Sequence, residues 1–255
     1  STAAVRARQR LSGAIGTAGQ QDRYTFTLNQ VTQLYVDSLM DNTSLVWSLV
    51  GPTNVSGHAF YQDGNYGLAL VKLLPGAYTF VVDGPGDFTG GYAFRLLDLA
   101  AATPLTKGAV TTGTLNPANE TDLHQFAGTA GEQIFLDLRS VSGNGGSGSA
   151  TWRLVNPYGQ VIQVSSLTDV GPILLPWTGT YTLMTEAPYY ATTPVDYSFV
   201  VQPVTDDVAA LTLNETIIGA IDVPGQQDHY TFTLPSAAKL YFDSFTNSSS
   251  VTWSL

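Results

Sequence analysis

The sequence contains no cysteine and few charged residues. Among its 255 residues, Asp, Glu, Lys and Arg together make up 12%, with 10 basic against 20 acidic side chains. The lack of cysteine excludes disulfides, thiolate nucleophiles and Cys-ligated zinc or iron–sulfur sites. The acidic excess argues against a nucleic-acid partner, because phosphate backbones are bound by a basic face. No membrane span is predicted, since the most apolar stretch, 68–82, is broken by Lys72, Pro75 and Gly76.

An internal repeat organises the sequence. The segment 13–49 returns at 219–255, an offset of 206 positions, with 20 of 37 residues identical. A weaker copy lies between them, in which four residues fall 100 positions after their counterparts: Gly113, Asp122, Phe126 and Asp137 after Gly13, Asp22, Phe26 and Asp37. The repeat predicts a lead-in (1–10), module A (11–101), module B (107–203) and module A′ (210–255), the first half of a second A-type unit. The short links 101–107 and 203–210 predict that neighbouring modules lie close together.

Alternating apolar and polar residues predict β-strands throughout the chain. Tyr24, Phe26 and Leu28 share one side of a strand, for example, and the residues between them are polar. One strand keeps an apolar inward set in every module: Leu45, Trp47 and Leu49; Ala150, Trp152 and Leu154; Val251, Trp253 and Leu255. Its outward positions vary, with Val46 and Ser48 in A but Thr151 and Arg153 in B. We therefore predict an all-β protein of tandem antiparallel β-sandwich modules of about eight strands, with jelly-roll and immunoglobulin-like winding both open.

Module A′ is predicted to hold only half of a sandwich. Four strands with one bare apolar face, which includes Val251, Trp253 and Leu255, are not expected to be stable alone in water. This face is predicted to mediate self-association, or to be completed by a donated strand or by a continuation of the same polypeptide.

Recurring aspartates form two sets in the repeat. Asp22 and Asp122 stand at turns just before strands, where an aspartate accepts backbone N–H bonds and fixes the turn. Asp37 and Asp137 recur one strand later and could converge with them on Ca²⁺, which prefers carboxylate and carbonyl oxygens. Because no calcium-loop motif accompanies them, turn bonding is the favoured interpretation, no cofactor is expected and calcium is the alternative.

No catalytic arrangement recurs in the modules. His124 stands where module A has Tyr24, and His229 where it has Arg23, so neither histidine belongs to a repeated cluster. The Gly-x-Ser-x-Gly nucleophile elbow is absent from the sequence. We therefore predict that the protein is not an enzyme.

Aromatic residues in turns are the candidates for ligand binding. Module B carries Trp177 in a Pro-Trp-Thr-Gly turn and the run Pro188-Tyr189-Tyr190. Exposed aromatic side chains stack on sugars and dominate protein-binding hot spots. The competing interpretation is that these three side chains cap the ends of the sandwich.

The recurring motifs resemble those of the bacterial pre-peptidase C-terminal domain. In module A the resemblance rests on Gly13, Asp22, Tyr24, Phe26, Leu34, Tyr35, Asp37, Trp47, Leu49, Pro75, Gly76, Tyr78, Thr79, Phe80, Gly91, Tyr92 and Phe94. It implies a noncatalytic, extracellular β-sandwich of the kind that is appended to secreted proteases, or repeated in tandem in large bacterial surface proteins.

Two functions follow from these expectations. The first is a structural or adhesive repeat segment of a long bacterial cell-surface protein or filament, whose partners are copies of itself or the rest of the same polypeptide. The alternative is a substrate-targeting module of a secreted hydrolase, which binds a carbohydrate or a collagen-like extracellular polymer through Trp177, Tyr189 and Tyr190.

Overall fold

The structure is a computed structural model that describes residues 2–4, 9–40, 43–62, 69–142 and 150–255. The described residues form β-strands joined by turns, with two short 3-10 helices, η1 (Phe60–Gln62) and η2 (Leu99–Ala101). Over these ranges no helix is long and apolar enough to cross a membrane. Residues 5–8 of the predicted lead-in lie outside the described part of the chain.

Module A is a sandwich of two sheets. One sheet has the strand order β1-β3-β8-β5-β6, and the other has the order β2-β9-β4-β7. The strands are β1 (Thr2–Ala4), β2 (Leu11–Ile15), β3 (Gln21–Leu28), β4 (Thr32–Ser38), β5 (Val46–Val50), β6 (Val55–Ala59), β7 (Leu70–Leu73), β8 (Gly76–Asp83) and β9 (Gly90–Asp98).

Module B repeats this arrangement strand for strand. Its sheets have the orders β10-β12-β17-β14-β15 and β11-β18-β13-β16. The strands are β10 (Thr103–Pro104), β11 (Val110–Leu115), β12 (Thr121–Gly128), β13 (Gln133–Val141), β14 (Thr151–Val155), β15 (Val161–Ser166), β16 (Val170–Leu174), β17 (Gly179–Glu186) and β18 (Val195–Val204).

The strand order settles how the sandwiches are wound. In each module the strands after the first pass from one sheet to the other, except for one hairpin within a sheet, β5–β6 or β14–β15, and each sheet interleaves early and late strands, which is the double Greek key of a jelly roll. The pairings are antiparallel except for the parallel first strand, as in β1 with β3 and β10 with β12. The predicted fold class of tandem antiparallel β-sandwiches is confirmed, and the winding left open by the sequence is the jelly roll.

Each sandwich is filled by the predicted inward residues. The strand carrying the tryptophan buries its apolar set completely in both modules, at Leu45, Trp47 and Leu49 and again at Ala150, Trp152 and Leu154. Trp47 stacks on Phe80 at 5.5 Å between ring centroids, and Trp152 meets Phe199 edge-on at 5.0 Å. Alternation therefore identified the face of these strands that enters the core.

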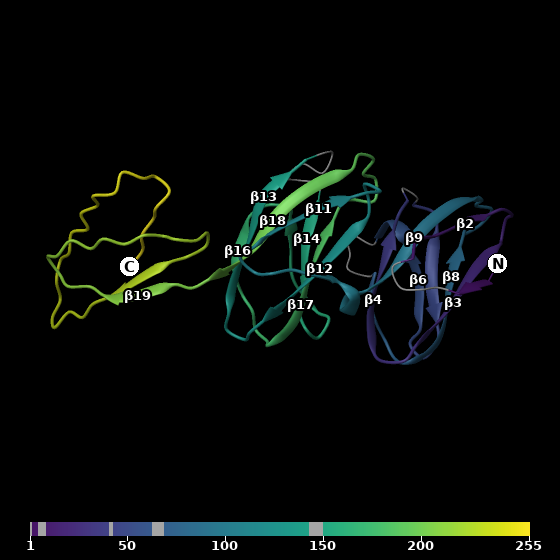
Figure 1. The fold of residues 1–255 in the computed structure, drawn as a ribbon, viewed down its shortest axis with the longest axis horizontal. Coiled ribbons are helices and arrows are strands. Elements are labelled where there is room, and N and C mark those ends of the chain that lie inside the picture. The colour runs from purple at the N-terminus through teal and green to yellow at the C-terminus, as the bar shows by residue number, and fades with distance from the viewer. Residues whose placement is uncertain (1, 5–8, 41–42, 63–68, 143–149) are drawn as a thin grey trace.

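The modules follow one another along the long axis of the molecule, A then B then A′ (Figure 1). The short links at residues 101–107 and 203–210 contain strands of their own, β10 and β19 (Asp207–Ala210). Both strands pair parallel with the aspartate-bearing strand of the next module, in the register of β1 against β3. Each of these modules therefore begins within the segment that the sequence marked as a link. Few residues remain between the modules to let one rotate relative to the other.

Module A′ departs from the expected half-sandwich. Within 210–255 the described strand is β20 (Asp228–Thr231), paired with β19, and residues 251–255 form no strand. Val251, Trp253 and Leu255 are exposed, and Trp253 stacks on Phe242 with 4.3 Å between ring centroids. In module A, by contrast, the equivalent residues form β5, which lies between β8 and β6.

Candidate functional site

The distinctive site is the junction where module A packs on module B. The outer face of β4 and β9 meets the outer face of β12, β14 and β17, so the sheets of A and B form consecutive layers of one stack (Figure 1). Three residues of module B, Leu123, Val155 and Met184, are buried in the same hydrophobic cluster as the core of module A. The two sandwiches therefore share a continuous apolar contact.

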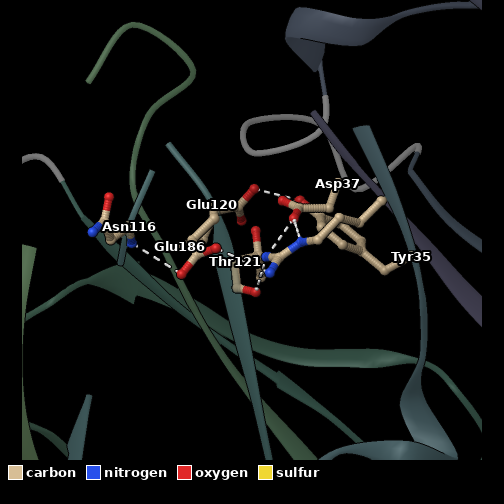
Figure 2. A network of polar contacts seen from close by, with 7 residues as sticks. Tyr35, Asp37, Asn116, Glu120, Thr121 and Glu186 are labelled. Carbon is tan, nitrogen blue, oxygen red and sulfur yellow. Dashed lines mark hydrogen bonds and ion pairs between the residues drawn. The ribbon is translucent and has the colours of Figure 1, made fainter. Parts of the chain in front are cut away.

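Arg95 of β9 links the two modules at this junction. Its Nε donates to Asp37 Oδ2 at 2.7 Å, and Asp37 lies on the neighbouring strand β4 with its side chain fully buried. Across the junction, Arg95 Nη1 lies 3.0 Å from Glu120 Oε2, and Nη2 donates to the Thr121 carbonyl oxygen at 3.0 Å. Figure 2 shows Asp37 on one side of this network and Glu120 and Thr121 on the other. One guanidinium thus pairs with carboxylates of both modules.

A second ion pair lies beside the first. Arg153 Nη2 of β14 is 3.1 Å from Glu186 Oε2 of β17, and both side chains are almost completely buried. The Tyr35 hydroxyl of module A donates to Glu186 Oε1, and the Arg153 guanidinium lies over the Tyr35 ring at 5.7 Å from its centroid. Charged side chains in a contact that excludes water require partners of opposite charge, because an unpaired buried charge is strongly unfavourable.

Burial perturbs the acidic groups of the junction. Burial raises the pKa of Asp37 to about 7, although the charge of Arg95 opposes the shift. Burial also raises the pKa of Glu186 against the opposing effect of Arg153. Both shifts follow from the exclusion of water where the two sheets pack together.

A separate polar cluster recurs inside each sandwich. In module A the Tyr92 hydroxyl donates to Asp22 Oδ2 at 2.6 Å, and the Tyr24 hydroxyl lies 2.7 Å from that of Tyr92. Gly13 leaves room for this cluster, since a Cβ there would lie 2.3 Å from the Tyr92 hydroxyl oxygen. The cluster explains why glycine, aspartate and an aromatic residue recur together.

Module B builds the same cluster with a histidine. The Tyr197 hydroxyl donates to Asp122 Oδ2 at 2.7 Å and lies 2.9 Å from His124 Nε2. Because that hydroxyl proton is given to Asp122, the histidine Nε2–H must donate to the tyrosine oxygen. Burial lowers the pKa of His124, which favours the neutral form of the ring. The interpretation that His124 lies outside any repeated cluster was wrong, because it replaces Tyr24 in the same hydrogen-bonded arrangement.

The four aspartates considered for calcium have protein partners. Asp22 and Asp122 accept from tyrosines inside the sandwiches, whereas Asp37 pairs with Arg95 in the other sheet. Asp137 lies 2.6 Å from Arg139 Nη2 in the equivalent sheet of module B. Among the described residues no three His, Cys, Asp or Glu side chains form a group that could hold a metal ion. The structure thus places the two predicted sets in separate polar contacts.

The three candidate aromatic residues do not form one surface. Trp177 precedes β17 and contacts Tyr158 edge-on at 5.7 Å, whereas Tyr189 and Tyr190 follow β17. At about 3.3 Å per residue, this strand of 8 residues separates them by roughly 26 Å. Tyr189 packs on Tyr61 of module A at 5.6 Å, and Tyr190 is half exposed. Any site at Trp177 is therefore distinct from one at Tyr190.

Sequence reasoning missed the junction itself. Arg95, Glu120, Arg153 and Glu186 were not singled out, and the outward position of Arg153 was regarded only as variable. An available signal was that outward positions of module B are apolar, at Leu123, Val155 and Met184. A sheet that is apolar on both faces is covered on both faces.

Comparisons with known proteins leave the family open. No protein-family model and no curated protein matches this chain. Among solved structures, the chain is similar to PliG of Aeromonas hydrophila, a periplasmic inhibitor of g-type lysozyme, with 16% identity, 40% of this chain and 96% of that chain covered, and a TM-score of 0.28. It is also similar to the CUB1-EGF-CUB2 domains of rat MASP-1, with 7% identity, 77% and 99% covered, and a TM-score of 0.27. Scores of this size carry no inference about function.

Proposed function

We propose that this chain is a noncatalytic structural segment of an extracellular bacterial surface protein, in which docked jelly rolls form a stiff spacer. The proposal is carried by one observation, the buried junction in which Arg95 pairs with carboxylates of both modules. A tether alone needs no such contact, whereas a spacer that must keep its length does. The bacterial and extracellular assignment rests on the resemblance to pre-peptidase C-terminal domains.

The stacked arrangement defines the length that each module adds. Sheets that pack face to face lie about 10 Å apart, so two sheets per module correspond to a rise of about 20 Å. Short parallel lead-in strands replace flexible linkers at both links. The spacer therefore gains length in fixed steps.

Self-association through module A′ belongs to the same proposal. Val251, Trp253 and Leu255 are exposed, whereas their counterparts Leu45, Trp47 and Leu49 are buried in module A. The occupant we propose is the same face of a second copy of this chain, because that face carries the same unburied apolar set. Sedimentation equilibrium is expected to show dimers that Trp253→Ser weakens at least tenfold. A wild-type chain that stays monomeric at high concentration contradicts self-association and favours the alternative partner, a continuation of the same polypeptide.

Small-angle X-ray scattering tests the spacer function. A rigid stack of modules A and B gives one maximum dimension that does not change with ionic strength and a scattering curve that one conformation fits. Two sandwiches that swing about a link give a broad distribution of dimensions instead. That outcome contradicts the proposed function.

The second candidate is a polymer-targeting module, and the contact between the exposed Tyr158 and the half-buried Trp177 favours it. Sedimentation with insoluble polysaccharides and with collagen separates the candidates. The spacer predicts no retention of the wild-type chain, whereas targeting predicts retention that Trp177→Ala abolishes. Because Tyr190 lies at the other end of β17, Tyr190→Ala is the matched control.

A further inference from the structure

We propose that the junction residues encode the order of the modules, so that the β4–β9 face of an A-type module accepts a B-type module and rejects another A-type module. The inference deepens the proposed spacer function and rests on it. Its basis is a comparison of equivalent positions in A, B and A′, which the shared hydrogen bonds and strand register define.

The position of Glu120 is fixed in all three modules by one hydrogen bond. A side-chain oxygen at this position accepts the backbone N–H of the residue four positions earlier. The bonds are Gly16 N to Gln20 Oε1 at 2.9 Å, Asn116 N to Glu120 Oε1 at 2.9 Å, and Asp222 N to Gln226 Oε1 at 2.8 Å. Gln20, Glu120 and Gln226 are therefore structurally equivalent.

The second terminal atom of this side chain distinguishes the module types. In A and A′ it is an amide nitrogen that donates within its own module, from Gln20 to Asp22 at 3.2 Å and from Gln226 to Asp228 at 3.0 Å. In module B it is a carboxylate oxygen, and it lies 3.0 Å from Arg95 of the preceding module. Replacing one amide by one carboxylate thus turns an internal donor into an acceptor for the neighbouring module.

The facing position changes together with it. In module A, Asp37 stands opposite Arg95 in the β4–β9 ladder, and in module B, Asp137 stands opposite Val200 in the β13–β18 ladder. Asp137 pairs instead with Arg139, which belongs to its own strand and is half exposed. The face that module B offers to A′ therefore carries valine at the position of Arg95.

Only an alternating order satisfies both positions. With A following A, the Arg95 guanidinium would meet the amide of a glutamine, which donates to its own module. With B following B, the buried Glu120 carboxylate would meet Val200 and lose its cation. An unpaired charge in such a contact is costly, so the mismatched orders are disfavoured by repulsion and desolvation as well as by missing attraction.

The test rebuilds the B-to-A′ combination at the A-to-B junction of the full chain. Glu120→Gln alone puts glutamine, the residue of A-type modules, opposite Arg95 across the junction. This single substitution is expected to lower the thermal midpoint of unfolding by about 3–8 °C. Adding Arg95→Val and Leu39→Arg gives module A the valine and the internal arginine of module B, and is expected to recover at least half of that loss. The proposal is overturned if Glu120→Gln does not change the thermal midpoint, or if the triple variant loses as much stability as the three single substitutions added together.

Two further measurements keep the test decisive. Leu39 is buried, so the pair Arg95→Val and Glu120→Gln is also measured as a double-mutant cycle without it. A coupling of about tenfold or more between the two sites is expected, and additive effects overturn the proposal. Glu132→Gln is the matched control, because Glu132 pairs with Lys107 inside module B and the changes in module A must not rescue it. X-ray scattering from the wild-type chain tests the spacer function separately. Failure of the proposed module order can therefore be distinguished from failure of the spacer function.

Discussion

Replacement of Arg153 by methionine isolates the contribution of the second buried ion pair. Arg153→Met keeps most of the length and apolar volume of the side chain but leaves Glu186 without its cation. Both side chains are at most 4% exposed. Removing one partner of such a pair costs about 3–5 kcal/mol, because the remaining charge stays buried. The hydroxyl of Tyr35 still donates to Glu186, so we expect the lower end of that range.

The structure also sets an upper bound on this loss. Modules A and B can separate and return Glu186 to water, so the destabilisation cannot exceed the free energy of docking. At about 2–4 °C per kcal/mol for a chain of this size, a loss of about 3 kcal/mol corresponds to a thermal shift of roughly 6–12 °C. Differential scanning calorimetry measures this shift, and scattering detects separation of the modules.

Two further variants make the result interpretable. Arg153→Met combined with Glu186→Gln removes both charges and is expected to be within about 1 kcal/mol of the wild type. Arg139→Met is the comparison variant: its partner Asp137 is also buried, but Arg139 is half exposed, so water reaches this ion pair and a smaller loss than for Arg153→Met is expected. The reasoning is refuted if Arg153→Met is no more harmful than Arg139→Met, or if the double variant is as unstable as the single one.

Three other predictions concern the buried polar groups. Gly113→Ala is expected to lower the free energy of unfolding by about 1–3 kcal/mol, measured by urea unfolding, because the added Cβ would lie 2.2 Å from the Tyr197 hydroxyl oxygen. Gly91→Ala is the control and is expected to be nearly neutral, since its Cβ would have no neighbour closer than 3.8 Å. Tyr92→Phe is expected to cost about 1–3 kcal/mol, measured by thermal unfolding, since it removes the hydroxyl that donates to Oδ2 of the buried Asp22; an unchanged midpoint contradicts the role of this hydrogen bond. Because the pKa of Asp37 is raised to about 7 from 3.8, its contribution to stability is greatest below pH 3.8 and is lost as the pH rises through 7. The urea midpoint is therefore expected to be higher at pH 5 than at pH 8, and Asp37→Asn to reduce that difference; an equal difference in the variant contradicts the assignment.

The core strands were predictable because their signal is local. Leu45, Trp47 and Leu49 alternate along one strand, and the same spacing returns at Ala150, Trp152 and Leu154. Side chains on a strand point alternately to its two faces, so a buried face must show this period. The structure buries all six residues.

The recurring Gly13, Asp22 and Tyr24 were visible as a pattern but not as a contact. Their partner, Tyr92, lies 70 positions from Asp22 and reaches it only after β2, β3 and β9 have assembled. For the same reason the sequence showed that His124 stands at the position of Tyr24 but not that both side chains contact the same tyrosine hydroxyl of their module. Sequence spacing does not report a hydrogen bond between strands whose pairing is unknown.

By itself the sequence determined the fold class, the repeat and the identity of the core faces, because each is written in periodic positions that the backbone geometry imposes. Only the tertiary structure decided that one outer face of A packs on one outer face of B, and that Arg95 pairs with Glu120 in this contact. Outward positions carry no period that separates solvent from a second protein layer. Which of the two covers them depends on how whole sandwiches pack, and that is a property of surfaces assembled from distant strands.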